Sequence, residues 1–479
     1  MNTAEALGLL GSLSENEKLL KEAFDHLVNL PHSFQSKILS SFKSGKVEPQ
    51  AYINIKKLGI KDLPEWYGVL EKRYIEFDRR RKCLKQAIEW LDGISRDIDL
   101  NPVLIKGAAI HFLYGDVIRA SNDMDVWIED TENLWKFVSH MRMNGCQSKE
   151  AWFLSRREDT NEPWFLTGLW SREFENGECD FDLHSGKYST MFLESLRMPG
   201  LKEVAVGIEG YSSLRQLNPE ASLLLLIGHS HSHNRITIRD INDAYILLTK
   251  TKVDLLWFWE QIKINSLEEI ATELFNWMKI IYPDTSDLSI LNLKVLRNTR
   301  NKEMWPVKYN YKNVLNHWWN YSNETGYTRV KEIVTLSWAN IFANVISPKL
   351  SSQDFSKYTE GILNKISKFR TRSASYYYMC CPQMFEEDVS IPMNMTIDEQ
   401  FATSLRKNGC SAVFDQLLNS VIVKLNNGFV HINTSGVYIA SENLLFSDEI
   451  IEDTVLFLEN NLTHLKSDPL KYDPLVAKI

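Results

Sequence analysis

The hydrophobic pattern of the first hundred residues is helical. Between Glu65 and Ser95, apolar side chains recur three and four residues apart, which is the period of one face of an α-helix. A basic run from Arg79 to Lys82 falls inside this helix. It is typical of a solvated helix face, with a phosphate-facing role as the alternative. We therefore predict a helical segment over residues 1–100.

After residue 100 the pattern changes to short strands and helices. The β-rich run Pro102–Lys106 leads into a helix that begins at Gly107. A strand over Met124–Ile128 then leads into a helix with Thr131 as its expected N-cap. Together with a later alternating strand, these elements predict a mixed sheet with helices over residues 101–215.

The second half of the chain returns to helices and then to strands. Helical spacing dominates from Pro219 to Tyr282, and the aromatic-rich stretch 285–345 continues it. Strand patterns at Val421–Leu425 and Val430–Ala440 flank an Asn-Asn-Gly turn and predict a hairpin or meander. A last helix is expected over Ile450–Leu465.

The predicted fold class is therefore α/β, of the α+β kind, with helical N-terminal and central segments around a mixed sheet. The chain divides into a helical N-terminal segment over 1–100, a mixed α/β core over 101–215, a helical domain over 216–345 and a small C-terminal α/β extension over 346–479. No internal repeat or long flexible linker separates these parts.

The composition and net charge of the chain limit the kinds of molecule that it is expected to bind. The 479 residues are 44% hydrophobic and 24% charged, as in ordinary globular proteins, and the formal net charge is −8. With an isoelectric point near 5.9, no general affinity for nucleic-acid backbones is expected. We therefore expect a small-molecule, peptide or protein partner rather than a long nucleic acid.

Nothing in the pattern predicts a membrane span or an export signal. No window approaches the ~18–20 consecutive apolar residues of a membrane helix. The first twenty residues lack the basic start and long apolar stretch of a signal peptide. The six cysteines form no CxxC pair and are typical of reduced thiols. These features predict a cytoplasmic protein.

Two acids, Asp123 and Asp125, stand at the start of the strand predicted over Met124–Ile128. Residues i and i+2 of a strand share a face, about 6.5–7 Å apart. Carboxylates at this spacing can converge on divalent cations, which lie ~3.5–4 Å apart in two-metal phosphoryl-transfer sites. Since Mg²⁺ prefers oxygen ligands, the pair predicts a Mg²⁺ or Mn²⁺ site. The alternative is a turn residue followed by a surface acid.

A third carboxylate is expected from the alternating stretch Glu178–His184. Its apolar side chains face one way, and the other face carries Asp180, Asp182 and His184. Asp180 and Asp182 share this face and both are flanked by apolar residues, so side-chain direction does not choose between them. A solvated strand acid with no ligand is the alternative.

Lys106 and Gly107 join the first strand of this region to its helix. Free N–H groups and the helix dipole favour a phosphate at such a helix start, and the missing Cβ of glycine lets the phosphate approach closely. Lys106 would contact that phosphate or serve as an ion-pair partner within the protein.

Taken together, these blocks resemble a known family. The stretches LIKGAAIHFLYGDVIRASNDMDVWI, FDLHSG and LLLLIGHSHSHNRITIRDINDAYILL occur in the same order as in the bacterial nucleotidyltransferase-like family. That family carries the pattern KGaa…Y…R…DiDlLV and a downstream acid-Leu-His strand, on the nucleotidyltransferase superfold shared with DNA polymerase beta. The resemblance covers about residues 100–250 and implies that 101–215 is a nucleotidyltransferase catalytic core.

The resemblance implies roles for the acids. Asp123 and Asp125 match the metal-binding pair, and Asp182 matches the third acid because it directly precedes Leu-His. His184 would then orient a substrate phosphate or hydrogen-bond the carboxylates. Asp180 stays open as the alternative third ligand.

The resemblance also implies a nucleotide-binding role for the residues around the helix start. Gly107 matches the phosphate-loop glycine, and Lys106 and Arg119 match the basic positions that flank the motif. Arg119 would clamp the triphosphate or balance the charge of the carboxylates. Two positions depart from the family: Ala108 stands where the superfold usually has Ser or Gly, and Ser185 where many relatives have Trp.

The activity implied is Mg²⁺-dependent transfer of a nucleotidyl group from a nucleoside triphosphate to a small-molecule, peptide or protein acceptor. Two other interpretations stay open. A nucleotide-sugar donor at the same metal site would give glycosyl transfer instead. Loss of catalysis would leave a non-catalytic binding scaffold.

Overall fold

The computed structural model describes residues 1–115, 117–121, 123–148, 152–156, 163–186, 189–190, 194–196, 198–232, 235–265, 267–283, 307–308, 376–380, 396–416, 418–441 and 448–462. The helices predicted over 285–345 lie outside the described residues, which in that stretch comprise strand β12 (Val307–Lys308) alone.

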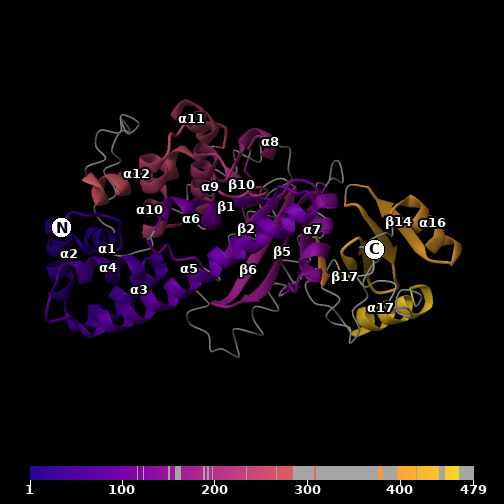
Figure 1. Ribbon diagram of the computed structural model, residues 1–479, viewed down its shortest axis with the longest axis horizontal. Coiled ribbons are helices and arrows are strands. Elements are labelled where there is room, and N and C mark those ends of the chain that lie inside the picture. The colour runs from indigo at the N-terminus through magenta and orange to yellow at the C-terminus, as the bar shows by residue number, and fades with distance from the viewer. Residues whose placement is uncertain are drawn as a thin grey trace.

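The N-terminal segment is helical, as the sequence predicts (Figure 1). It comprises α1 (Thr3–Leu10), α2 (Glu17–Val28), a 3-10 turn (His32–Phe34), α3 (Gln35–Gly45), α4 (Glu48–Lys57) and α5 (Glu65–Asp97). Their apolar faces meet in one core, where the rings of Phe24 and Phe42 lie 6.3 and 6.2 Å from the ring of Trp66. Because isolated helices this short are marginal in water, this burial is what stabilises α1 to α4.

The basic run of α5 is matched by acids on the same helix. Arg81 and Lys82 both pair with Asp78, at 3.0 and 2.8 Å. Arg80 pairs with Glu76 at 2.6 Å. Each partner lies one helical turn earlier, where side chains three and four residues apart meet. This part of the run is therefore a surface helix face with its own counter-charges.

A mixed sheet runs through the middle of the molecule (Figure 1). Its strands are β1 (Val103–Ile105), β2 (Asp123–Ile128), β3 (Gln147–Ser148), β4 (Trp152–Arg156), β5 (Pro163–Phe174), β6 (Gly177–Gly186), β9 (Ala205–Gly207) and β10 (Arg215–Leu217). The order is β4-β5-β6-β2-β1-β10-β9, and β3 pairs with β5. β2 pairs with β6 and β1 with β10 in parallel, while the other neighbours are antiparallel. The mixed α/β prediction is confirmed.

Alternation along β2 and β6 divides their side chains between two layers. Met124, Val126, Phe181 and Leu183 are fully buried against the C-terminal half of α5 and against α7 (Thr131–Met143). The residues between them face the opposite layer, where Trp127 joins the core formed by α1 to α4 and the helices after β10. The acids at the start of β2 therefore lie on the side of the sheet that faces these helices.

In the described residues up to Tyr282, four helices follow β10. They are α9 (Pro219–Ser232), α10 (Ile238–Lys250), α11 (Leu255–Ile264) and α12 (Glu268–Ile281). Helices α9 and α10 lie toward the side of the sheet that carries the acids of β2, and α11 and α12 pack against them (Figure 1). The hydroxyl of Tyr282 accepts from the Leu13 amide at 2.8 Å and donates to Asn242 Oδ1 at 2.7 Å. The N-terminal and central helices thus share one hydrophobic core. None of the helices in the described part of the chain combines the length and apolarity of a membrane span.

Two predicted helix starts differ from the structure by one residue. α7 begins at Thr131, but its N-cap is Asp130, whose side chain accepts from the Asn133 amide at 2.7 Å. A carboxylate caps better than threonine here because it also meets the positive end of the helix dipole. α6 (Lys106–Tyr114) begins at Lys106 rather than Gly107, and Lys106 has a positive φ of 50°.

In its described residues, the C-terminal extension is a small antiparallel sheet with two helices. It comprises α16 (Glu399–Lys407), β14 (Ser411–Asp415), β15 (Ser420–Lys424), β16 (Phe429–Asn433), β17 (Gly436–Ser441) and α17 (Asp448–Asn461). The strands follow one another in order, so β15 to β17 form the predicted meander. β14 and α16 were not predicted.

This extension continues the central sheet instead of standing apart from it. Strand β13 (Tyr376–Cys380) pairs with β17 on one edge and with β4 on the other. The indole of Trp135 in α7 donates to the Leu418 carbonyl at 2.8 Å, and its ring lies 5.9 Å from that of Tyr438. The extension and the α/β core therefore bury surface against each other.

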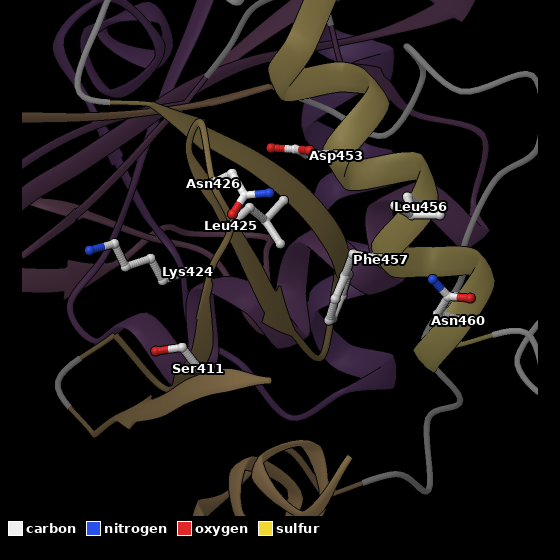
Figure 2. Close-up of a pocket in the computed structure, with 8 residues that line it drawn as sticks. All are labelled: Ser411, Lys424, Leu425, Asn426, Asp453, Leu456, Phe457 and Asn460. Atoms are coloured by element: carbon white, nitrogen blue, oxygen red, sulfur yellow. The ribbon is translucent and has the colours of Figure 1, made fainter. Parts of the chain in front are cut away.

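A cavity of about 510 Å³ lies in the extension, between the end of β15 and α17 (Figure 2). It is lined by Ser411, Lys424, Leu425, Asn426, Asp453, Leu456, Phe457 and Asn460. Of its two charged side chains, Asp453 already accepts from the Asn427 amide at 3.1 Å. None of the acids or basic residues predicted to bind a nucleotide lines this cavity. The predicted acids lie on β2 and β6 of the central sheet instead.

Candidate active site

The register of two parallel strands brings the acids together. In the β2–β6 pair, Asp125 lies directly opposite Asp182, and Asp123 directly opposite Asp180. Because side chains alternate between the faces of a sheet, all four point to the same layer. The strands thus place two rows of two carboxylates side by side.

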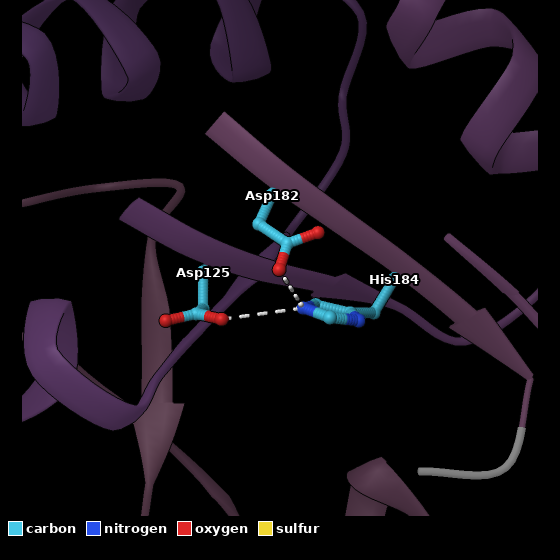
Figure 3. A group of neighbouring side chains, drawn as sticks. All are labelled: Asp125, Asp182 and His184. Atoms are coloured by element: carbon cyan, nitrogen blue, oxygen red, sulfur yellow. Dashed lines mark hydrogen bonds and ion pairs between the residues drawn. The ribbon is translucent and has the colours of Figure 1, made fainter. Parts of the chain in front are cut away.

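Three of the polar side chains on this face form a compact group (Figure 3). His184 Nε2 lies 3.3 Å from Asp125 Oδ1 and 3.3 Å from Asp182 Oδ2. One ligand atom from each residue lies within 4.8 Å of the others. Thr167 on β5 donates its hydroxyl to Asp182 Oδ1 at 3.0 Å and so fixes the second carboxylate. Two carboxylates and an imidazole at these distances are able to hold a metal ion.

Lys106 reaches the same group from the neighbouring strand. β1 and β2 are antiparallel, with Ile105 opposite Asp125, so the next residue along the chain lies beside that acid. The Lys106 Nζ is 2.5 Å from Asp125 Oδ1. The structure thus places Lys106 both at the start of α6 and against the central carboxylate.

The charges of the group favour ionised carboxylates. Burial would raise the pKa of Asp125, but the Lys106 ammonium and the hydrogen bond from His184 outweigh it and hold that pKa well below its usual range. Asp182 is half-buried, and although burial raises its pKa, the charge of His184 outweighs this and lowers it. Burial disfavours the imidazolium, yet the two carboxylates raise the pKa of His184 to about 9. The His184 imidazolium therefore lies between the two carboxylates and neutralises them, as a bound metal ion would.

Asp123 stands apart from this group. It is exposed at the start of β2, while Asp125 is buried, and it is not one of the three clustered ligands. Two effects raise the pKa of Asp123: the larger is the loss of solvent around the carboxylate, and the second is the negative charge of Asp125. Three cations oppose this rise: Lys106, Arg239 and Lys46. Asp123 is thus repelled by Asp125 and attracted by these three basic side chains.

Arg119 is directed away from the acid pair. Its Nε and Nη2 donate to the two oxygens of Asp243 in α10, at 2.8 and 2.6 Å. Tyr114 donates its hydroxyl to Asp243 Oδ1 at 2.7 Å. This buried pair leaves Arg119 Nη1 without a hydrogen-bond partner. Arg119 forms its ion pair with Asp243 and none with Asp123 or Asp125.

Gly107 accommodates this arginine. A Cβ on Gly107 would lie 2.5 Å from Arg119 Nη1 and 2.8 Å from Ser121 Oγ, well inside normal contact distance. The guanidinium cannot swing aside easily, because Asp243 holds it with two hydrogen bonds. The glycine therefore serves the packing of Arg119 against α6, in addition to the close phosphate approach expected from the sequence.

Four residues around the site were not assigned a role there from the sequence. They are Thr167, Arg239, Asp243 and Lys46. For Asp243 a signal existed, because helical spacing places it three and four residues from Ile246 and Leu247, on a face that must be buried. For Lys46 and Arg239 none existed, since only the tertiary fold brings them near Asp123.

Comparison with known proteins identifies a family for this chain. Residues 34–279, just over half of the chain, match the family described as uncharacterised nucleotidyltransferase. The matched region contains both acid-bearing strands and runs from the start of α3 into the last turn of α12. No curated protein matches the chain.

Among solved structures, the chain resembles an antigenic nucleotidyltransferase-like protein from Paracoccidioides brasiliensis at 18% identity and a TM-score of 0.30, over 44% of this chain and 93% of that one. It also resembles JHP933 from Helicobacter pylori at 15% identity and a TM-score of 0.26, over 45% of this chain and 85% of that one. Similarity at this level says nothing about activity. On the family match across residues 34–279, the chain belongs to this nucleotidyltransferase family.

Proposed function

We propose that the protein is a Mg²⁺- or Mn²⁺-dependent nucleotidyltransferase, which moves a nucleotidyl group from a nucleoside triphosphate to a small-molecule, peptide or protein acceptor. One observation carries the proposal: Asp125 and Asp182 lie opposite each other on parallel strands, joined by His184 Nε2 at 3.3 Å from each. Membership of the family supports a nucleotide as substrate. The net charge of −8 favours a small or protein acceptor over a long nucleic acid.

The donor set fits a hard divalent cation. Asp125 and Asp182 supply carboxylate oxygens, which Mg²⁺ and Mn²⁺ prefer, and both are held in the ionised form. Asp123 adds a third carboxylate on the same face, and its exposure suits it to a ligand that arrives from solvent. When bound, the cation would neutralise phosphate charge in the way known for phosphoryl transfer.

The chain's own residues would bind and orient the donor. Lys106 and the free N–H groups at the start of α6 would hold phosphate oxygens. His184, fixed between two carboxylates, would orient a phosphate beside them. Arg119 takes a positioning role in this proposal, because Asp243 occupies two of its nitrogens.

The reaction would be a single displacement at phosphorus. The oxygen of an acceptor hydroxyl, whose proton passes to solvent, or a phosphate oxygen forms a bond to the α-phosphorus, while the bond from that phosphorus to the bridging oxygen breaks in line. Pyrophosphate leaves with the electron pair of the broken bond. The protein contributes positioning and charge neutralisation, which are the main sources of rate acceleration in phosphoryl transfer.

Mass analysis of reaction products tests the proposal. The full-length protein would be incubated with Mg²⁺, each of the four nucleoside triphosphates or a panel of nucleotide sugars, and separate small-molecule and protein acceptor pools. We expect pyrophosphate release and an acceptor that gains one nucleoside monophosphate, with Asp182→Asn as the inactive control. Transfer of a sugar with release of a nucleoside diphosphate would favour glycosyl transfer. Consumption of neither donor would favour a binding scaffold.

A further inference from the structure

The first turn of α10 carries a second arginine, Arg239, whose charge acts on Asp123. The turn is fixed by a capping box, in which the Asp240 amide donates to Thr237 Oγ1 at 3.2 Å and the Thr237 amide donates to Asp240 Oδ2 at 2.8 Å. Arg239 lies within it and donates from Nη1 to the Ala120 carbonyl at 3.0 Å. Ala120 lies three residues before Asp123, in the segment that enters β2.

The acids near Arg239 on its own helix are already occupied. Asp240 completes the capping box with Thr237. Asp243 accepts two hydrogen bonds from Arg119 and one from Tyr114. Among the residues that the structure describes, no carboxylate lies within 4.0 Å of the Arg239 guanidinium.

The charge of Arg239 is therefore only partly neutralised, because Asp240, Asp243 and Asp123 attract it at longer range without forming an ion pair. Its Nε is buried and has no hydrogen-bond partner, and Nη1 is its one nitrogen with a partner among the described residues. Burial and the nearby Arg119 lower the pKa of Arg239. Arg239 is half-buried, and a guanidinium without an ion pair is stabilised when an anion binds beside it. The contrast is with Arg119, whose charge Asp243 neutralises.

We propose that Arg239 contacts the phosphates of the nucleotide donor from the side of Asp123. The inference rests on the proposed function and extends it, because it adds a residue of the helical region to the substrate site. A guanidinium presents a planar set of N–H donors that matches the oxygens of a phosphate. The bond to Ala120 fixes the side chain and leaves Nη2 for such a ligand, whereas Nε is buried.

A purely structural role is the competing explanation. In that case Arg239 would only fasten the segment 117–121 to α10 through Ala120. Its replacement would then lower stability without a specific effect on anion binding. The two roles are separated by measuring phosphate affinity and unfolding on the same variants.

Calorimetric titration of inorganic tripolyphosphate into the full-length protein, with Mg²⁺ present, measures this contact without a nucleobase. Arg239→Gln keeps an N–H donor for Ala120 but removes the charge. We expect its affinity for tripolyphosphate to fall about 10–100-fold, the size of a charge-assisted hydrogen bond. Arg79→Gln, on the exposed face of α5, changes the net charge equally and should bind like the wild type.

If Arg239→Gln does not fold, the same titration is made with Arg239→Lys. An ammonium retains the charge but cannot form two parallel bonds to phosphate, so we expect a loss of about three- to tenfold. Wild-type affinity in every folded Arg239 variant would overturn the proposal. A wild-type protein that binds no tripolyphosphate would contradict the proposed function itself, which is a different outcome.

Discussion

Replacing Asp125 by asparagine is expected to abolish nucleotidyl transfer while the protein stays folded. The amide keeps the shape of the carboxylate but removes the charge that lies between Lys106 Nζ and His184 Nε2. Loss of a metal ligand should lower turnover by more than the ~10–100-fold typical of residues that only orient ligands. Pyrophosphate release at saturating triphosphate and Mg²⁺ measures the activity, and circular dichroism checks the fold.

Asp180→Asn is the matched control for this variant. Asp180 lies on the same face, one pair along the strands, opposite Asp123 instead of Asp125. It is not one of the three clustered ligands, so its variant should keep activity. Normal turnover in a folded Asp125→Asn protein would refute the metal-site assignment. Equal losses in the Asp180 and Asp182 variants would mean that both acids serve the site.

Replacing Asp243 by alanine is expected to have the largest effect on stability. The Asp243 side chain is 1% exposed and accepts from both Arg119 and Tyr114. Its removal leaves the Arg119 guanidinium buried without a counter-charge, and breaking a buried pair in this way costs about 3–5 kcal/mol. Urea unfolding followed by tryptophan fluorescence measures the change in the free energy of unfolding.

Two further variants separate the buried pair from ordinary ion pairs. Glu76→Ala removes a surface partner of Arg80 and should cost no more than about 1 kcal/mol. Arg119→Leu combined with Asp243→Leu removes both charges and should destabilise less than Asp243→Ala alone. A loss below about 1 kcal/mol in Asp243→Ala would show that the pair does not hold the site together.

The strands that carry the site were predictable because their hydrophobic pattern is strict. Met124 and Phe181 alternate with acids on β2 and β6, so the amino-acid pattern alone separates the core side of each strand from its polar side. The preference for Asp182 over Asp180 came from a family resemblance. The structure supplies the parallel register, which sets Asp182 opposite Asp125.

What the sequence could not predict depends on contacts between distant segments. Arg119 and Asp243 are 124 residues apart along the chain, and their pairing follows from how α10 packs against α6. The same packing brings Arg239 near Asp123. In the C-terminal extension, β14 was not predicted because its outward-facing Val413 is apolar although 61% exposed, which breaks the alternation of apolar and polar residues that marks a strand.

The binding of Mn²⁺ together with a nucleoside triphosphate tests the central claim most directly. Water-proton relaxation reports the slower tumbling of Mn²⁺-nucleotide when it joins the protein, and it needs no acceptor. We expect clear enhancement with the wild type and with Asp180→Asn for at least one of the four triphosphates. The enhancement should disappear in Asp125→Asn and Asp182→Asn. Enhancement of wild-type size in these two variants, or none with any triphosphate on the wild type, would contradict a metal–nucleotide site between β2 and β6.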